Sequence, residues 1–222
     1  MSGAPAAGRR LVARTRRVDH DLDLAALAGA DGVLFERSRT GLAGRGVAAQ
    51  VDVAEAAEAL GAIEVVEDEV AAPGSGPVGF AALPFRAEQP ATLVIPRVVW
   101  GRAEDGTRWT TTVGDDGEPE PDDVAHTVPA DPTTAPSRVT VSPVRPSAWW
   151  CGLVARATEA MQQAGPDGLR KVVLAREVLV EADQPFDRAA VLARLRSAFP
   201  GCFLFHVDGF LGASPELLVS RA

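Results

Sequence analysis

The sequence predicts a fold of the α+β class in which strands outnumber helices. Apolar stretches rich in β-branched and aromatic residues recur from residue 10 to about residue 114, as expected of strands. Capped stretches with helical periodicity are fewer. The 222 residues are 46% hydrophobic and 23% charged, so the chain has ordinary globular composition and enough length to bury a sizeable core.

We interpret residues 1–114 as a mixed α/β subdomain. It begins with an expected edge strand over 9–17, where arginines alternate with apolar residues. Strands are predicted over 32–37 and 46–53, separated by a glycine-rich turn at 40–46. Three more strand candidates follow at 76–85, 91–101 and 107–114.

One helix is predicted inside this subdomain, over residues 52–61. It opens with Asp52 as N-cap, has Glu55 three residues later and stops at Gly61. Residues 115–137 then change character, because acids and prolines dominate and apolar periodicity is lost. This composition predicts a solvated linker or long surface loop, with an acidic binding tail as the alternative.

The segment 138–222 returns to regular structure. We expect a strand over 138–144 and a helix over 147–165 with Ser147 as N-cap and Gly165 as stop. One face of that helix carries an apolar stripe that we assign to the core. The stripe consists of Trp149, Trp150, Leu153, Val154, Ala157 and Met161.

A strand over 170–181 follows, and then a helix over 187–199 capped by Asp187. Residues 202–214 predict a hairpin that turns at Asp208-Gly209. The last residues, 215–222, resemble the start of another strand, so we expect the natural domain to continue beyond them.

Composition narrows the class of protein. A net charge of −8 argues against a broad nucleic-acid surface, and the arginines at 9–17 fit a strand better than a nucleic-acid arm. No apolar stretch approaches the roughly 20 residues that span a bilayer. Cys151 and Cys202 lack CxxC partners, and without asparagine no N-glycosylation site exists. We therefore expect a cytoplasmic protein with neither nucleic-acid nor membrane partners.

Two common kinds of site are not indicated by the sequence. Its glycine-rich stretches match neither phosphate-binding pattern. His20, His126 and His206 are widely scattered and lack metal-ligand spacing, and we expect His206 to be a satisfied core or edge histidine.

Lys171 stands out because it is the only lysine in the chain and lies in the apolar, strand-like run 170–181. Burial of an ammonium group lowers the pKa of a lysine, so a buried lysine can act as a base. Arginine stays protonated and cannot replace it. The alternative is a structural lysine that extends to solvent at a strand end or pairs with Glu177.

Glu216 is the second candidate. It follows Ser214-Pro215 and precedes the apolar pair Leu217-Leu218, and we expect it to begin a strand after the break at Pro215. A carboxyl group held among apolar residues can donate a proton. The alternative is a surface glutamate at a strand start. Ser214 lacks the glycine two positions later that a nucleophile elbow requires.

The two motifs "LRKVVLAREV" and "FLGASPELLV" together resemble the chorismate-utilising enzymes, and isochorismate synthases in particular. The upstream stretches "GPVGFAALPF" and "ATLVIPRVVWG" agree with this resemblance. It implies the N-terminal half of the family's α+β fold, with mostly antiparallel sheets and packed helices. The segment 138–222 would then be the start of an incomplete chorismate-binding catalytic domain.

The resemblance implies roles for three residues. Lys171 would be the general base that activates water, Glu216 the general acid, and Ser214 a contact to the substrate chorismate. Water would add at ring carbon C2 while the C4 hydroxyl leaves. The lysine favours isochorismate synthases over the ammonia-using relatives, whereas salicylate synthase stays open as an alternative.

Family members are much longer than this chain. The part absent here carries the glutamates that bind Mg²⁺, so the resemblance implies a magnesium cofactor but no metal ligand in these residues. We therefore expect little or no activity from this chain alone, and a monomer at full length. A non-catalytic half-length binding module is the alternative from another class of protein. Menaquinone and siderophore pathways both stay open.

Overall fold

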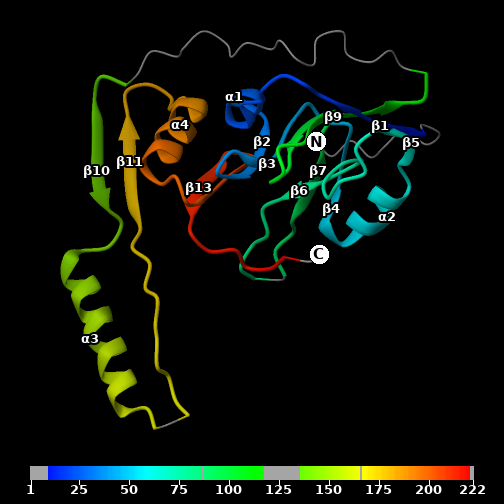
Figure 1. Ribbon diagram of the computed structural model, residues 1–222. Helices are drawn as coiled ribbons and strands as arrows, with labels where there is room; N and C mark the ends of the chain where they lie inside the picture. Colours follow the sequence, from blue (N-terminus) through cyan, green and yellow to red (C-terminus); the bar gives the residue numbers. More distant parts are fainter. Residues whose placement is uncertain (1–9, 87, 118–135, 166, 221–222) are drawn as a thin grey trace. The chain divides into compact units, whose positions relative to one another are not determined.

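The computed structural model describes residues 10–86, 88–117, 136–165 and 167–220 (Figure 1). The chain divides into two compact units: unit 1 comprises Met1–Thr133 with Asp187–Ala222, and unit 2 comprises Thr134–Phe186. Strands dominate and helices are few, which confirms the mixed α+β class. Most of the predicted linker at 115–137 lies outside the described residues, and the predicted subdomain boundaries stay a prediction.

Unit 1 is built around an eight-stranded sheet. All neighbouring strands are antiparallel except one parallel pair at an edge, β1 with β5. The order across the sheet is β13 (Phe210–Ser214), β12 (Phe203–Val207), β2 (Val33–Arg37), β3 (Thr40–Arg45), β8 (Val98–Arg102), β9 (Arg108–Asp115), β1 (Leu11–Arg17) and β5 (Glu64–Asp68).

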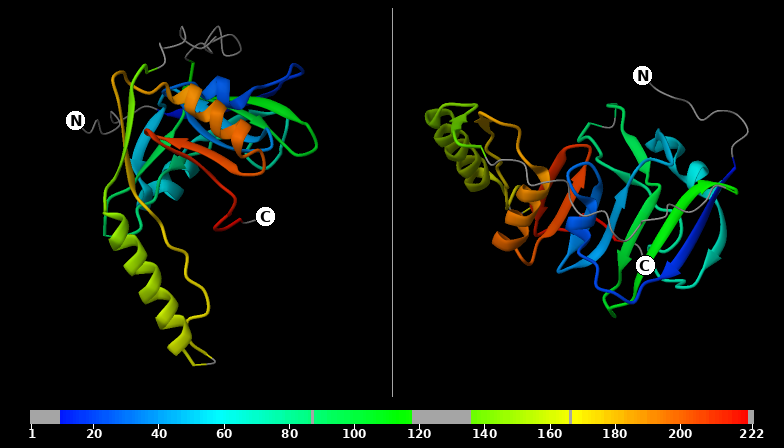
Figure 2. Two further views of the ribbon diagram at one scale, coloured as in Figure 1. Left: turned by 90° about the vertical axis from the view of Figure 1, so that its left-hand side faces the viewer. Right: turned by 90° about the horizontal axis from the view of Figure 1, so that it is seen from above.

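Each face of this sheet has its own apolar core. Helices α1 (Leu24–Ala28) and α4 (Arg188–Ala198) lie side by side over one face (Figure 2). Their core includes Leu34, Trp100 and Leu192, all buried. The other face packs against a second sheet, β4 (Ala49–Asp52), β7 (Thr92–Ile95) and β6 (Phe80–Ala81), and against α2 (Ala56–Gly61).

The strand predicted at residues 9–17 is present as β1. Its predicted position at the edge of the sheet is wrong, because β1 lies between β9 and β5. Strand β5 was not predicted from the sequence, because its residues are mostly charged. The pairing explains why: Arg10 forms an ion pair with Glu64, and Arg16 Nε lies 3.5 Å from Glu67 Oε2. The charged residues of β5 thus pair with arginines of β1 instead of forming an apolar pattern of their own.

The predicted turn at 40–46 is also wrong, because residues 40–45 form β3 between β2 and β8. The chain turns one step earlier, at Ser38 and Arg39, which both have positive φ. Gly41 and Gly44 serve close packing instead. A Cβ at Gly41 would lie 2.1 Å from the carbonyl oxygen of Phe35, and one at Gly44 would lie 2.6 Å from the ring of Pro96.

Several local predictions are confirmed. The hairpin β12–β13 turns at Asp208 and Gly209, whose φ values of 49° and 78° match a two-residue turn of the primed type. Asp187 caps α4 by accepting from the amide of Ala189 at 2.9 Å. Asp52 caps a short 3₁₀ turn, Val53–Glu55, that leads into α2. The stretch 91–101 forms two strands, because Pro96 separates β7 from β8.

Unit 2 consists of β10 (Val139–Pro143), α3 (Ser147–Gln163) and β11 (Val178–Ala182), with β10 and β11 antiparallel. Ser147 is the first helical residue and makes no capping hydrogen bond, so its predicted N-cap role is wrong. The predicted core stripe is wrong as well, since none of the α3 residues is buried. Trp149 and Val154 are 42% and 40% exposed, although the Arg145 guanidinium lies over the Trp149 ring, 5.4 Å from its centroid.

We predict that Gly101→Ala destabilises unit 1. A Cβ at Gly101 would lie 2.0 Å from Cε2 of Trp109, whose ring is buried and cannot swing away. Overpacking of this kind costs about 1–3 kcal/mol, measurable as a lower midpoint in urea unfolding. Gly61→Ala is the matched control, because nothing lies within 4 Å of its added methyl. Equal midpoints for the two variants would contradict the prediction.

None of the helices in the described part of the chain is long and apolar enough to cross a membrane.

Candidate active site

The motif that carries Glu216 begins at the end of β13. Ser214 is the last residue of this strand and pairs with Phe203 of β12. Its hydroxyl oxygen accepts a hydrogen bond from the amide of Glu216 at 3.2 Å and donates to the carbonyl oxygen of Glu216 at 3.2 Å. Ser214 therefore fixes the backbone that presents Glu216.

The surroundings of Glu216 differ from the expected ones. Residues 216–220 form no strand, and Glu216 itself is exposed. The neighbouring Leu217 and Leu218 are 45% and 97% exposed, so they do not enclose the carboxyl group. The prediction of a new strand at Glu216 is wrong, because Pro215 ends the ladder and none of the described residues pairs with the chain after it.

Lys171 lies in unit 2, in the extended stretch before β11. Residues 171–177 make no ladder, since β10 pairs only with Val178–Ala182. The predicted strand over 170–181 therefore forms only at its end, and Lys171 is exposed rather than buried. Its neighbour Val173 is 82% exposed. The side chain is accessible to a reactant, but unit 2 does not enclose it.

Lys171 and Glu216 thus belong to different units, and each is exposed in its own unit. Ser214 and Glu216 are brought together by their hydrogen bonds. The roles of all three residues stay predictions.

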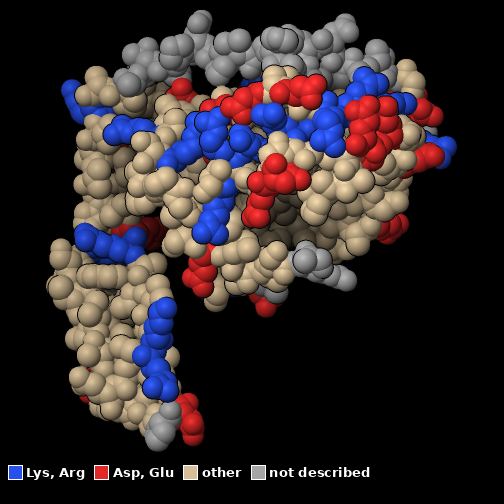
Figure 3. All heavy atoms as spheres, in the orientation of Figure 1, with Lys and Arg blue, Asp and Glu red and all other residues tan. Residues whose placement is uncertain are grey.

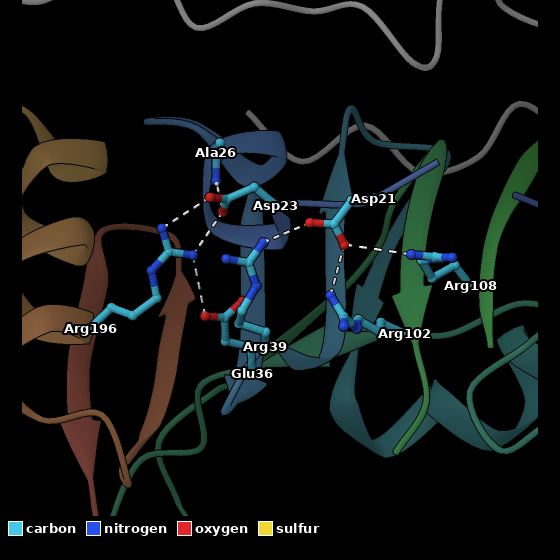
Figure 4. A network of polar contacts seen from close by, with 8 residues as sticks. All are labelled: Asp21, Asp23, Ala26, Glu36, Arg39, Arg102, Arg108 and Arg196. Atoms are coloured by element: carbon cyan, nitrogen blue, oxygen red, sulfur yellow. Dashed lines mark hydrogen bonds and ion pairs between the residues drawn. The ribbon is translucent and has the colours of Figure 1, made fainter. Parts of the chain in front are cut away.

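A partly buried charge cluster in unit 1 was not predicted from the sequence (Figure 4). Arg196 of α4 donates two hydrogen bonds to Asp23, from Nη1 to Oδ1 at 2.8 Å and from Nη2 to Oδ2 at 3.0 Å. The same Nη1 lies 3.6 Å from Oε1 of Glu36 on β2. Asp23 also caps α1 by accepting from the amide of Ala26. The cluster Asp23–Arg196–Glu36 therefore joins α4, α1 and the sheet.

Glu36 is the unusual member of this cluster. Its side chain is 1% exposed, and neither of its oxygens makes a hydrogen bond within the described part of the chain. Burial raises the pKa of Glu36, while the Arg196 guanidinium opposes that rise. The hydrogen bonds from Arg196 lower the pKa of Asp23. One sequence signal could have indicated that Glu36 is buried: it follows Leu34 by two residues in the same strand, so both side chains point to the same face of the sheet.

A second group of charges surrounds Asp21 on the surface of unit 1. Its carboxylate pairs with Arg39 at 3.0 Å, with Arg102 at 2.9 Å and with Arg108 at 3.6 Å. Acidic and basic side chains accordingly alternate over this side of the molecule (Figure 3). One carboxylate faces three guanidinium groups here, so this surface carries a local positive excess despite the negative charge of the chain.

The cluster Asp23–Arg196–Glu36 borders a pocket of about 460 Å³. Half of its lining is polar and half is apolar: Glu36, Ser38, Arg39, Arg196, Phe199, Pro200, Cys202 and Leu204. Both arginines in the lining already pair with aspartates, Arg39 with Asp21 and Arg196 with Asp23. Arg196 thus has its own aspartate, whereas Arg39 shares Asp21 with Arg102 and Arg108.

The comparisons with known proteins place the chain in a family. The sequence profile of the family described as "Chorismate binding enzyme" matches residues 43–222. The chain belongs to the chorismate-binding enzyme family. The match includes both motifs, and therefore Lys171, Ser214 and Glu216. The resemblance to chorismate-utilising enzymes is confirmed.

Two curated proteins from the same organism are similar to this chain. They are provisionally named isochorismate synthase MenF, from the CDC 1551 / Oshkosh and ATCC 25618 / H37Rv strains of Mycobacterium tuberculosis. Each is 32% identical over 161 residues, an alignment that covers 67% of this chain and 37% of the relative. The chain thus spans little more than a third of the length of these relatives. No solved structure matches it significantly.

The described residues of this chain do not fit a magnesium site. Among them, no three side chains of His, Cys, Asp or Glu gather closely enough to hold a metal ion. Asp21, Asp23 and Glu36 are instead engaged by arginines. Magnesium therefore stays an expectation from the family resemblance, and the chemistry proposed below is assigned to the chain's own side chains.

Proposed function

We propose that this chain supplies the acid and the base of an isochorismate synthase, which converts chorismate to isochorismate. The observation that carries the proposal is the family match over residues 43–222, because it includes both Lys171 and Glu216. The relatives named as isochorismate synthases support the particular reaction.

The proposed reaction forms one bond at ring carbon C2 and breaks another at C4. Water attacks C2 while Lys171 takes one of its protons, and both ring double bonds shift as the C4–oxygen bond breaks. Glu216 gives its proton to the departing hydroxyl, which leaves as water. The general acid and base each contribute about 10²- to 10⁴-fold to such a rate. Lysine suits the base role because its amine can lose a proton, whereas arginine stays charged.

The geometry adds a requirement to this proposal. Lys171 and Glu216 are exposed in separate units, so turnover needs a state in which both side chains reach one substrate and bulk water is excluded. We therefore propose that residues 1–222 alone have little or no activity. Within its unit, Ser214 acts on Glu216 through the backbone, and a direct contact between Ser214 and chorismate remains part of the proposal.

The test is a turnover assay on residues 1–222 and, where the reading frame continues past codon 222, on its complete product. Each is incubated with chorismate and Mg²⁺, and the products are separated chromatographically. We expect isochorismate from the complete product and little or none from residues 1–222. Turnover by residues 1–222 would contradict the proposed inactivity. Salicylate with pyruvate would instead identify a salicylate synthase, and no conversion by either protein would favour a binding module.

A further inference from the structure

His206 is buried in the sheet of unit 1 without a hydrogen-bond partner. It lies on β12 between Leu34 of β2 and Leu211 of β13. Its side chain is 1% exposed, and neither ring nitrogen has a partner in the described part of the chain. The expected core position of His206 is confirmed. The expectation that its polar atoms are satisfied is wrong, because neither ring nitrogen has a hydrogen-bond partner.

Helix α4 covers this part of the sheet. On β12, His206 faces the same side as Leu204, which belongs to the core cluster that contains Leu192 of α4. Leu192 is the only fully buried residue of α4. The two ends of the helix are held by arginines: Arg188 donates to the carbonyl oxygen of Ala30 at 2.9 Å, and Arg196 binds Asp23. One buried leucine, the partly buried Leu195 and two partly exposed arginines thus hold the helix in place.

The charges around His206 do not favour its protonation. Burial lowers the pKa of His206 below its ordinary value of 6.5, and the nearby Arg188 lowers it further. Asp31 and Asp208 act in the opposite direction but are weaker influences. A proton on the ring would create a second cation beside Arg188, with no acceptor among the described residues to receive its N–H groups.

We propose that His206 makes the packing of α4 sensitive to mild acid, so that α4 and the hairpin β12–β13 loosen below about pH 6.5. A protonated imidazole needs water or an acceptor. Helix α4 has one fully buried residue, Leu192, whereas α1 buries Leu24, Ala25 and Ala28, so α4 is the helix that moves first. The same hairpin leads to Ser214 and Glu216, but the inference holds whether or not Glu216 is catalytic.

The sign follows from linkage. Because the pKa of His206 is lowered in the folded state, the free energy of unfolding falls as the pH drops below the unfolded pKa of 6.5. Glu36, on β2, acts in the opposite direction, because its raised pKa means that it gains a proton more readily when folded. The low pKa of Asp23 keeps its pairing with Arg196 intact until the solution is more acidic than 3.8. Of these three groups, only His206 lowers the stability of the folded state as pH falls from 6.5 to 5.5.

The test is hydrogen–deuterium exchange by mass spectrometry on residues 1–222 at pH 7.5 and 5.5, with rates corrected for intrinsic exchange. We expect protection in α4 and the hairpin to fall by up to about tenfold at pH 5.5, the limit that linkage sets one unit below the unfolded value. Protection in β8 and β9 should stay constant. His206→Leu should abolish the acid response, whereas the exposed His20→Gln should keep it.

Two outcomes would overturn the proposal: no loss of α4 protection in the parent protein, or the same loss in His206→Leu. Should His206→Leu not fold, an NMR titration of His206 in the parent protein decides instead. A titration midpoint clearly below 6.5 supports the proposed acid sensitivity of α4, and a midpoint at or above 6.5 contradicts it.

Discussion

Replacing Lys171 with alanine should lower kcat for the conversion of chorismate to isochorismate by about 10²- to 10⁴-fold in a protein that performs this reaction. The variant lacks the amine that accepts the proton from water. KM should change little, because water rather than chorismate is the partner of the base. The measurement is steady-state kinetics on the product of the complete reading frame.

Two further variants separate this chemistry from a mere effect of charge. Lys171→Arg keeps the positive charge but cannot release a proton, so it should be as slow as the alanine variant. Arg170→Ala removes the neighbouring exposed charge and should retain parent-like activity. Full activity in Lys171→Arg would show that the position needs a cation rather than a base, and the proposed mechanism would fail.

Replacing Arg196 with methionine should lower the free energy of unfolding by about 3 kcal/mol, because it leaves a buried carboxylate without its counter-charge. Glu36 is 1% exposed and Arg196 is its ion-pair partner. Asp23 would also lose both of its hydrogen bonds to Arg196. Urea unfolding at pH 7.5 measures the effect.

The pH dependence of this loss identifies its origin. Burial raises the pKa of Glu36 in the folded state, so the stability lost at high pH returns as pH falls through that raised value and the carboxyl becomes neutral. The defect of Arg196→Met should thus be smaller in mild acid than at pH 7.5. Glu36→Gln, combined with Arg196→Met, should recover part of the loss at pH 7.5. A defect that grows in mild acid would contradict this account.

Arg39→Met is the matched control for Arg196→Met. It removes an arginine from the lining of the same pocket, but its partner Asp21 is 61% exposed and keeps two other arginines. Partly exposed pairs of this kind contribute about 1 kcal/mol or less. Equal losses in the two arginine variants would show that burial of Glu36 is not the cause.

Local signals sufficed for elements stabilised by their own neighbours. The hairpin at Asp208-Gly209 and the cap at Asp187 were both predictable, because a primed turn and an N-cap are decided within a few residues. Strand β9 was predictable from its β-branched residues. The glycines of β3 suggested a turn, but Gly44 admits the ring of Pro96 from the connection between β7 and β8, much later in the chain, and Gly41 admits the carbonyl oxygen of Phe35 in the neighbouring strand β2.

The candidate site shows the same division. The motifs around Lys171 and Glu216 were sufficient to indicate the family, which the match over residues 43–222 confirms. Their exposure was not predictable, since it depends on which elements pair with residues 171–177 and 216–220. Burial of a side chain is a property of its neighbours in space, and an alternating pattern indicates only that neighbours are expected.

The sequence by itself determined the α+β class, the hairpin, the capped helix α4 and membership of the chorismate-binding enzyme family. Only the tertiary structure decided that β1 is internal, that Glu36 is buried beside Arg196 and that His206 has no hydrogen-bond partner. The physical reason is distance along the chain. Arg196 lies 173 residues from Asp23, and such partners meet only when the sheet brings β2 and β12 together.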